Sequence, residues 1–590
     1  MLLQRGQSMN IKKTGYAVVF ICAAAMFTAG FGVNAMAKSS SLSKAVTSSK
    51  KTVKETTTKA VTVEETTEAT TAAKSEKTTK KTSSGRSKGG SSSAASKKAT
   101  TTTEETTEKA TVTETTTETT TLAPPVDANG IPLTGVELAV HNIIAGTPKD
   151  QWAKKFTADW KEETVENNDY VLKQRNVTFE NGDIFYMHRY NFKKNDQNPL
   201  VTGLSIPGSK IEIRYVDQND NWYMSTNIEN TAYETLFIDT DKASLIIGVP
   251  AVYMNDTTAN TLVRVPEQEK KVVITKEDSG YRLTYEFPRN MQVMGEIWVL
   301  RSNYKLADWT NAKHFEALKH DLSKERRLCW DGYYFPIPYN YKPNAPNMIY
   351  RHPSNYAGAS FVKSATFLAT KDLGYVMTKI CMANQNAQGY WQTGPQSEWL
   401  MSDFSIDGGF YDTRFNTDFA ENLLYAYQAY NDEEFLDALV RYGEFFKSHA
   451  ADHSYPTQNG GILVEDYGHN KAHTQTHVSL NHQLAELNLL YRMYDLTKHQ
   501  PYLELADKML LAVEDTRDQW VLPSNNLNYA VHYTGTYNTM VDYPFLTYND
   551  LYTTRHLLRT YFNRNSDTVQ YLMDCKLDWM KKNNVTGYYE

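Results

Sequence analysis

Cysteine is scarce in this chain: only four of its 590 residues are cysteines. Cys22 lies in the apolar N-terminal segment, so Cys329, Cys381 and Cys575 are the ones left for the rest of the chain. Three cysteines can form at most one disulfide, and no metal-ligand spacing joins them. A disulfide-dense scaffold is therefore excluded, and the folded part must be stabilised by packing.

Motifs of several common enzyme classes are also missing. The chain has no Gly-x-Ser-x-Gly elbow, no P-loop and no dinucleotide fingerprint. The formal net charge is −6 and no basic stripe is present, which argues against nucleic acid as a partner. His469, His473 and His477 recur at intervals of four, but Gly468 and Asn470 disfavour a helix there, so a polar loop is favoured over a metal site. We expect no metal and no cofactor.

The first residues have the pattern of an export signal. Lys12 and Lys13 precede an apolar run from Tyr16 to Val33, and Ala35-Met36-Ala37 has the form of a cleavage site. We predict a signal peptide at residues 1–37 and a secreted or extracellular protein. The apolar run is close to the shortest length that spans a bilayer, so an uncleaved anchor at the cell surface is the alternative.

Aromatic residues are absent from Lys38 to Leu122, where Thr, Ser, Lys, Glu, Ala and Gly predominate. Such a segment cannot bury enough apolar area to offset the entropy lost on ordering. The composition predicts a disordered linker over residues 38–124, which would hold the folded part away from a surface.

The remainder is too long for one hydrophobic core, so two domains are expected. Residues 125–310 contain alternating apolar and polar stretches separated by polar turns, at Lys210–Val216, Lys271–Thr275 and Tyr281–Phe287. Strands with frequent turns and no intervening helices favour a β-sandwich-like domain.

After about Asn311 the apolar residues recur at spacings of three and four, which is typical of helices. The expected helices are Phe361–Ala383, Phe415–Tyr430, Glu433–His449, Val478–Leu496, Pro501–Val513, Phe545–Phe562 and Ser566–Lys582. Successive antiparallel pairs of this kind predict an α/α toroid (an incomplete barrel) over residues 311–590, with loops lining its central cleft. The chain as a whole is therefore expected to be a multidomain α and β protein.

Two adjacent carboxylates and three tyrosines fall beside the predicted helix connections, where functional groups concentrate. They lie in Glu465-Asp466-Tyr467, Leu527-Asn528-Tyr529 and Val541-Asp542-Tyr543. A phenol next to a carboxylate suits an enzyme that moves a proton on and off carbon. Each tyrosine taken alone also fits a packed residue at a helix end. Asp407, Asp412, Asp466 and Asp542 could supply paired acids for glycoside hydrolysis, but a sequence does not reveal their separation.

The stretch from about residue 400 to 585 resembles the D-glucuronyl C5-epimerase family, whose members invert uronic acids in heparosan-type chains. Gly409–Asn416 continuing through Leu423–Tyr427 resembles the family helix that opens with Gly-Trp-Tyr-Ser. Val464–Tyr467 resembles Trp-Tyr-Glu-Glu-Tyr-Pro, Leu527–Tyr529 resembles the segment with the second tyrosine, and Val541–Tyr543 followed by Asn549–Leu551 resembles Trp-Asp-Tyr and Asn-Gln-Leu.

The resemblance implies a uronate C5-epimerase that acts on an acidic polysaccharide. Its catalytic residues would be Asp466, at the position of the family glutamate, with Tyr467, Tyr529 and Tyr543. Substrate contacts would come from Asn416, His532 and Asn549. The sequence departs from the family pattern where Asp466 replaces glutamate, His532 replaces arginine, and Pro544 and Thr547 replace histidines.

The expected reaction removes the C5 proton to Tyr467 or Tyr543 and returns a proton from a tyrosine on the opposite face, with Tyr529 as the alternative. Asp466 would need to be protonated, or to share a proton with the sugar carboxylate, because two bare carboxylates repel. Two other interpretations stay open: a polysaccharide lyase, since β-elimination begins with the same proton abstraction, and a non-catalytic glycan-binding surface protein. The sequence is compatible with a homodimer.

Overall fold

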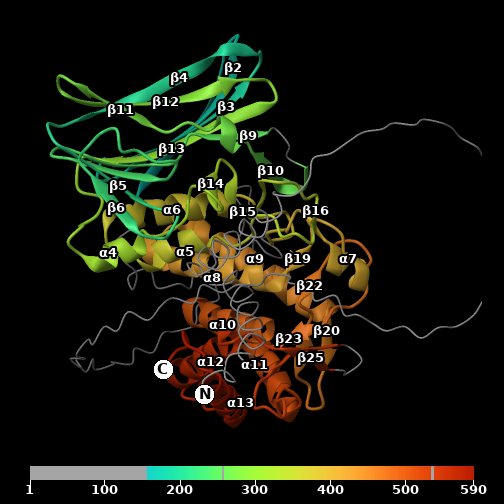
Figure 1. Cartoon of the computed structure of the whole chain (residues 1–590). Helices are drawn as coiled ribbons and strands as arrows, with labels where there is room; N and C mark the ends of the chain where they lie inside the picture. Colours follow the sequence, from blue (N-terminus) through green and yellow to red (C-terminus); the bar gives the residue numbers. More distant parts are fainter. Residues whose placement is uncertain (1–155, 255–257, 533–536) are drawn as a thin grey trace, which may run out of the picture.

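The computed structural model describes residues 156–254, 258–532 and 537–590 (Figure 1). The predicted signal peptide, the predicted linker and residues 125–155 of the expected β-rich domain lie outside this described part. Within it, antiparallel sheets are followed by paired helices, and the two halves pack against each other. None of the helices described combines the length and the apolar character that a membrane span requires.

A large antiparallel sheet forms the centre of the β-rich half. Along its main path the described strands follow the order β14-β15-β17-β10-β9-β13-β8-β7-β5-β6, and β3, β2 and β1 continue from the other edge of β13. The strand bounds are β1 Ala158–Glu166, β2 Tyr170–Phe179, β3 Ile184–Phe192, β5 Ile211–Val216, β6 Trp222–Ser225, β7 Leu236–Thr240, β8 Ser244–Ile247, β9 Ala251–Met254, β10 Thr261–Arg264, β13 Val293–Ser302, β14 Arg327–Cys329, β15 Gly332–Pro336 and β17 Met348–Arg351.

A small sheet covers one face of the large sheet. It consists of β4 (Asp196–Pro207), β11 (Val273–Glu277) and β12 (Gly280–Arg289), in the order β11-β12-β4. Leu283 and Phe287 of β12 are fully buried in one apolar cluster with Ile213 and Ile297 of the large sheet. Two sheets packed face to face in this way enclose a core between them.

The other face of the large sheet rests on helices, and β13 shows how its residues are divided. Ile297 and Val299 belong to the core between the sheets, whereas Trp298 and Leu300 belong to the core shared with the helices. Because successive side chains of a strand point to opposite faces, a strand covered on both sides is mostly apolar. The sheet is therefore the middle layer of the molecule.

Strands continue past residue 310, where the helical half was expected to begin. Helix α4 (Ala312–Ala317) is followed by β14, β15 and β17, which complete one edge of the large sheet. These strands have three to five residues each and are separated by turns, so they are too short for a period of two to be visible. The first long helices begin only at Tyr356.

Within the described residues, the helical half is built from four pairs of consecutive helices. The pairs are α5 (Tyr356–Lys363) with α6 (Leu368–Met382), α8 (Thr413–Tyr430) with α9 (Glu433–Asp452), α10 (Leu480–Thr497) with α11 (Gln500–Asp515), and α12 (Leu546–Phe562) with α13 (Asp567–Lys582). Helices α5, α8, α10 and α12 contact each other in that order and form one row. Helices α6, α9, α11 and α13 form a second row behind it, and α7 (Glu398–Phe404) lies in a connection.

Short strands and turns fill the connections between the helices. The pairs are β16 (Tyr341–Lys342) with β18 (Gln396–Ser397), β19 (Tyr411–Asp412) with β22 (Tyr467–Gly468), and β20 (Ser454–Pro456) with β21 (Ile462–Val464). A further small sheet has the order β23 (Val478–Ser479), β24 (Asn528–Val531) and β25 (Tyr537–Val541). Single turns of 3₁₀ helix are η2 (Thr258–Asn260), η3 (Pro266–Gln268) and η4 (Arg517–Gln519).

Capping residues explain why the helices begin and end where they do. The Asp412 carboxylate accepts a hydrogen bond from the backbone N–H of Phe415 at 2.9 Å and so caps α8. Asn431 ends that helix in the left-handed region, with φ of 51°, and Asp432 caps the next. The Asn-Asp pair therefore turns the chain from α8 into α9.

One expected helix is divided in two. The predicted helix Phe361–Ala383 appears as α5, which ends at Lys363, and α6, which starts at Leu368. The Thr370 hydroxyl donates to the carbonyl of Ser364 at 2.6 Å. Hydroxyl groups that bond the backbone in this way compete with helical hydrogen bonds, so the polar stretch between the two helices forms a turn.

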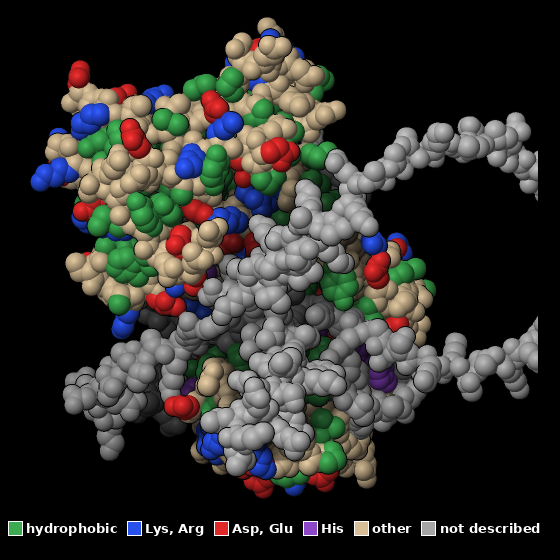
Figure 2. Space-filling model, in the orientation of Figure 1, with side chains coloured by type: hydrophobic (Ala, Val, Ile, Leu, Met, Phe, Trp, Pro, Cys, Tyr) green, Lys and Arg blue, Asp and Glu red, His purple; other side chains and the backbone are tan. Residues whose placement is uncertain are grey.

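The β-rich half shows no concentration of one charge on the visible face. Figure 2 shows Lys and Arg interspersed with Asp and Glu over this surface. The mixture agrees with the small net charge of −6.

Candidate functional site

The candidate site lies at the N-terminal ends of α8 and α10, where three segments distant in sequence meet. Strand β19 pairs with β22, so Asp412 lies directly opposite Tyr467. The backbone N–H of Thr413 donates to the carbonyl of Asp466 at 3.0 Å. Strand β23, immediately before α10, pairs with β24, which carries Tyr529. Non-local strand pairing thus brings these groups together.

The structure brings all four predicted catalytic residues into one group. The ring of His477 lies 5.8 Å from that of Tyr467 and 5.9 Å from that of Tyr529, and the rings of Tyr529 and Tyr543 are 5.8 Å apart. We call Asp466, Tyr467, His477, Tyr529 and Tyr543 the tyrosine cluster. A change of register in the β24–β25 pairing between Asn528 and Ala530 marks a β-bulge at Tyr529. Bulges of this kind redirect a side chain from the regular face of a strand.

Asp466 is fully buried and is held by a backbone amide and two histidines. Its Oδ1 accepts a hydrogen bond from the N–H of Ser479 at 2.9 Å and lies 3.6 Å from Nδ1 of His482. Its Oδ2 lies 3.2 Å from Nε2 of His477. Although burial opposes ionisation, His482 and His477 lower the pKa of Asp466 below its ordinary value. In this structure the two histidines therefore favour the ionised form of Asp466. The expectation that Asp466 is protonated, or shares a proton with the sugar carboxylate, concerns the complex with substrate and stays a prediction.

The phenols are held in their neutral form. Burial, with the nearby carboxylate of Asp412, raises the pKa of Tyr467 well above its ordinary value. Burial and the neighbouring Tyr543 do the same for the pKa of Tyr529. A phenol with a raised pKa keeps its proton at neutral pH, so both hydroxyls are proton donors in the resting site.

Asp412 is a second carboxylate of the site. Burial, with the charge of Asp466 nearby, raises the pKa of Asp412 well above its ordinary value. Two neighbouring carboxyl groups with pKa values displaced in opposite directions are a frequent feature of functional sites. Of the four acids considered for paired-acid chemistry, Asp407 instead pairs with His469 and Lys471, and Asp542 pairs with Lys576.

His482 is a buried, neutral imidazole beside this group. Its Nδ1 lies 2.5 Å from the hydroxyl oxygen of Thr413, and burial lowers the pKa of His482 to about 4. Its ring is 5.9 Å from that of Tyr467. At neutral pH the imidazole therefore carries no charge.

The partly exposed side of the cluster is formed by Tyr529, Tyr543 and His532. The ring of His532 lies 5.6 Å from that of His477, and burial lowers its pKa below the ordinary value. His532 is therefore at the site, as the resemblance implied for a substrate contact. It would meet a ligand as a neutral imidazole.

Two other predicted substrate contacts are used within the protein. The Asn416 amide accepts from the N–H of Trp391 at 2.7 Å and donates to the carbonyls of Trp391 and Asp412 at 3.0 and 2.9 Å. Asn549 accepts from the N–H of Tyr589 at 2.9 Å. Asn416 thus connects a loop to the start of α8, and Asn549 connects α12 to the C-terminal segment.

Asp542 and Lys576 position Tyr543. Lys576, on α13, is fully buried, and its Nζ donates to Asp542 at 2.7 Å, to Asn526 at 2.6 Å and to the carbonyl of Tyr543 at 2.7 Å. Asp542 also accepts from the Thr547 hydroxyl at 2.7 Å. We call Asn526, Asp542, Thr547 and Lys576 the anchoring network. It fixes the backbone from which Tyr543 extends.

Sequence reasoning missed His477 and His482 as site residues. His477 had been considered with His469 and His473 as a helical metal face, but residues 469–476 form an irregular loop, as expected from Gly468 and Asn470. His477 pairs with Asp466, while His469 turns away to Asp407 at 2.9 Å. The position of His477 just before β23 is only a weak sign of a site residue. The pairing of β23 with β24, which brings His477 to the site, is not visible in one sequence.

Comparisons with known proteins identify no family. No family model matches the chain, and no curated protein matches it. Among solved structures, the alignment with a sugar epimerase from a ruminal bacterium has 13% identity and a TM-score of 0.32, and covers 46% of this chain and 69% of that one. The alignment with a cellobiose 2-epimerase from Spirochaeta thermophila has 11% identity and a TM-score of 0.29, and covers 38% of this chain and 56% of that one. The alignment with a glycoside hydrolase family 76 mannosidase from Bacteroides thetaiotaomicron has 12% identity and a TM-score of 0.29, and covers 38% of this chain and 57% of that one.

The chain thus spans a little more than half the length of the last two structures. Similarities at these TM-scores do not indicate a function for this chain.

Proposed function

We propose that this protein is a uronate C5-epimerase resembling the D-glucuronyl C5-epimerases, with its site on an incomplete α/α toroid formed by the two rows of helices. The observation that carries the proposal is the meeting of Tyr467, Tyr529 and Tyr543, from three separate segments, around the Asp466–His477 pair. Residues 1–37 would direct the enzyme to export, and residues 38–124 would hold it away from a surface. Its partner would be an acidic polysaccharide.

Epimerisation at C5 requires a base on one face of the sugar and an acid on the other. The C5–H bond breaks as the base takes the proton, and its electron pair moves into the adjacent carboxyl group to form an enediolate. A proton delivered to the opposite face of C5 then restores the carboxylate with inverted configuration. A pair of proton-transfer groups placed apart is therefore the minimum that the site must supply.

The tyrosine cluster contains such groups. Neutral Tyr467 and Tyr529 have protons to give, and His477 lies between them with its Nε2 3.2 Å from Oδ2 of Asp466. His477 has an imidazole beside both tyrosines, so it can receive the proton of one tyrosine while that tyrosine takes the C5 proton. Tyr543, in ring contact with Tyr529, supplies the donor for the other face.

Deuterium incorporation at C5 tests this proposal directly. The purified protein is incubated with uronic-acid polymers in heavy water, and the C5 proton is followed by NMR. The double variant Tyr467→Phe/Tyr543→Phe should abolish exchange, because phenylalanine keeps the ring and removes the transferable proton. Tyr561→Phe, on α12 and 51% exposed, is the matched control and should leave exchange unchanged. Undiminished exchange in the double variant would rule out the assignment.

A polysaccharide lyase is the second candidate, and His532 favours it. This partly exposed, neutral imidazole lies beside His477 at the edge of the cluster, where it could act as the base that begins a β-elimination. The leaving group at C4 would then depart and produce an unsaturated uronate. New ultraviolet absorbance during digestion, without deuterium at C5 of intact chains, would identify the lyase. Saturable glycan binding with neither signal would indicate a binding protein.

A further inference from the structure

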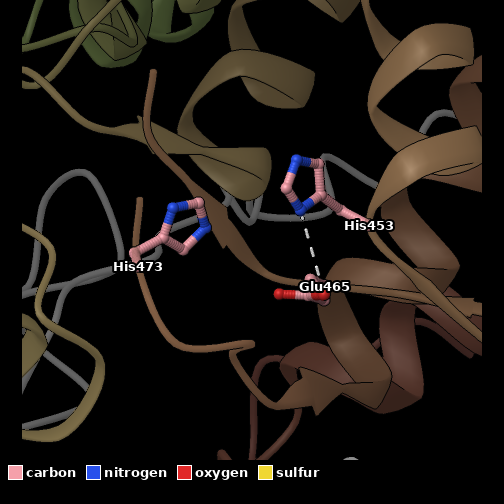
Figure 3. A group of neighbouring side chains, drawn as sticks. All are labelled: His453, Glu465 and His473. Atoms are coloured by element: carbon pink, nitrogen blue, oxygen red, sulfur yellow. Dashed lines mark ion pairs between the residues drawn. The ribbon is translucent and has the colours of Figure 1, made fainter. Parts of the chain in front are cut away.

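A hairpin next to the tyrosine cluster places a histidine opposite a glutamate. In the β20–β21 pair Ser454 lies opposite Val464, and one step further the N–H of Glu465 donates to the carbonyl of His453 at 3.0 Å. The two side chains extend from the open end of the hairpin on the same side. Nδ1 of His453 lies 3.9 Å from Oε1 of Glu465 (Figure 3).

A third side chain, His473, reaches this pair from the loop between β22 and β23. Its ring stacks on that of His453, with centroids 5.5 Å apart and an angle of 19° between the planes. One ligand atom from each of the three residues lies within 4.8 Å of the other two. Figure 3 shows both imidazoles and the carboxylate bordering one space.

The hydrogen bond of His473 leaves one nitrogen for a ligand. Its Nδ1 lies 2.9 Å from the carbonyl oxygen of Lys471, and because a carbonyl only accepts, Nδ1 carries the proton. The lone pair of the neutral ring is then on Nε2. Metal-binding histidines are commonly oriented by such a bond to a backbone carbonyl.

Glu465 is fully buried, and its charge is poorly compensated. It accepts hydrogen bonds from the N–H of Thr476 at 2.7 Å and from the Gln475 amide at 3.3 Å. Within the described residues, His453 is the basic group at ion-pair distance, and no lysine or arginine takes that place. A buried carboxylate needs a positive partner to offset the lost hydration.

We propose that His453, Glu465 and His473 bind one divalent transition-metal ion of the zinc class, with a water molecule at the fourth position. Two imidazole nitrogens and one carboxylate oxygen match the three protein ligands of open zinc sites. Ligand bonds of about 2.0–2.1 Å in a tetrahedron place the ligand atoms about 3.3 Å apart. The atoms of His453 and Glu465, at 3.9 Å, must therefore approach by about 0.6 Å, and the most distant pair, within 4.8 Å, by at most about 1.5 Å.

The ion would connect the β20–β21 hairpin to the loop that runs from Tyr467 to His477. The sequence predicted a polar loop in place of a metal site at His469, His473 and His477, and it gave no sign that His473 lies beside His453. This proposal does not depend on the proposed epimerase activity, and its test uses no glycan.

Metal retention by the whole purified chain tests the site. The protein is stripped with a chelator, incubated with Zn²⁺ alone, desalted and analysed by mass spectrometry for bound zinc, while competition with a coloured chelator gives the affinity. Wild-type protein should retain about one equivalent and show a higher midpoint of thermal unfolding with Zn²⁺, because a ligand that binds the folded state stabilises it.

Two variants and one control make the result specific. His473→Gln lies in a partly exposed loop, and it should fold normally while losing more than about 100-fold in zinc affinity and losing the thermal shift. His453→Gln should behave in the same way. His556→Gln, exposed on α12, should bind zinc like the wild type.

Either of two results would overturn the proposal. A folded wild type that retains no zinc would show that His453 and Glu465 form only an ion pair. Unchanged zinc affinity in both His473→Gln and His453→Gln would place any bound metal elsewhere.

Discussion

The anchoring network and the tyrosine cluster are both buried groups of polar side chains, yet they differ in how completely their atoms are paired. In the anchoring network Nζ of Lys576 has three acceptors, and both oxygens of Asp542 accept hydrogen bonds. In the tyrosine cluster, Oδ2 of Asp466 and Nε2 of His477 face each other at 3.2 Å as an ion pair, but neither atom has a well-aligned hydrogen-bond partner within the described structure.

This difference distinguishes the anchoring network, which holds the site in place, from the tyrosine cluster, which can bind or react. Buried polar atoms are nearly always hydrogen-bonded, so atoms without such partners need an explanation, such as a role in binding or catalysis. Adjacent residues of one segment thus have different tasks. Asp542 fixes the backbone of this segment through Lys576, and the neighbouring Tyr543 contacts the ring of Tyr529 in the tyrosine cluster.

Removal of the buried cation should give the largest loss of stability. Lys576→Met leaves Asp542 as an uncompensated buried charge, which destabilises a folded protein by about 3–5 kcal/mol. Chemical denaturation monitored by circular dichroism measures the change. The double variant Lys576→Met/Asp542→Asn should recover part of the loss, since it removes both charges. A loss below about 1 kcal/mol in the single variant would contradict the role given to this pair.

Much of the helical half could be predicted from local patterns. The period of the apolar residues and the caps at Asp412, Asn431 and Asp432 predict the limits of α8 and α9 closely, because helix boundaries depend on nearby residues. Strands β14, β15 and β17 could not be predicted, since short strands next to turns have no readable alternation and depend on a distant sheet edge for their partners.

The site was predictable only in part for the same reason. Resemblance indicated Asp466, Tyr467, Tyr529 and Tyr543, and the structure brings them together. The roles of their neighbours depend on non-local pairing: β23 with β24 brings His477 to His532, and the turn after β22 brings His477 to Asp466. The resemblance gave no indication of the two histidines, His477 and His482, that lie beside Asp466.

Replacement of His477 should affect chemistry far more than stability. His477→Gln removes the imidazole between Tyr467 and Tyr529, and loss of a proton-transfer group lowers rates by about 10²–10⁴-fold. Deuterium exchange at C5 measures the rate, and thermal unfolding monitors the fold. His469→Gln, a matched change in the same loop, should keep the wild-type exchange rate. Equal losses in both variants would indicate a general effect of the loop.

Glu486 extends the comparison to a buried carboxyl group outside the site. It accepts a hydrogen bond from Tyr442 at 2.8 Å and another from Thr417, and burial raises the pKa of Glu486 to about 8. Because the pKa of Glu486 is raised in the folded state, its contribution to stability is fully present below about pH 4.5, the ordinary pKa of glutamate. This contribution is lost as the pH rises through about 8.

Glu486→Gln should therefore change the pH dependence of stability. The variant mimics the protonated acid at every pH, so its unfolding free energy should match that of the wild type near pH 4.5 and exceed it at pH 9. Denaturation series at several pH values measure the difference between the two proteins, which cancels the titration of other groups. A constant difference across this range would show that Glu486 has an ordinary pKa.

The smallest effect is expected at the C-terminal end of α13, where Lys582 donates to Asp578 at 2.6 Å with 65% of the lysine side chain exposed. Lys582→Met is the same chemical change in the same helix as Lys576→Met, but water already compensates both charges, so the denaturation midpoint should stay within error of the wild type. Asp578 also keeps its bond from Asn525 at 2.6 Å. If both lysine variants lost similar stability, helix propensity or charge in α13 would be the cause. The anchoring network would then no longer differ from an ordinary surface ion pair.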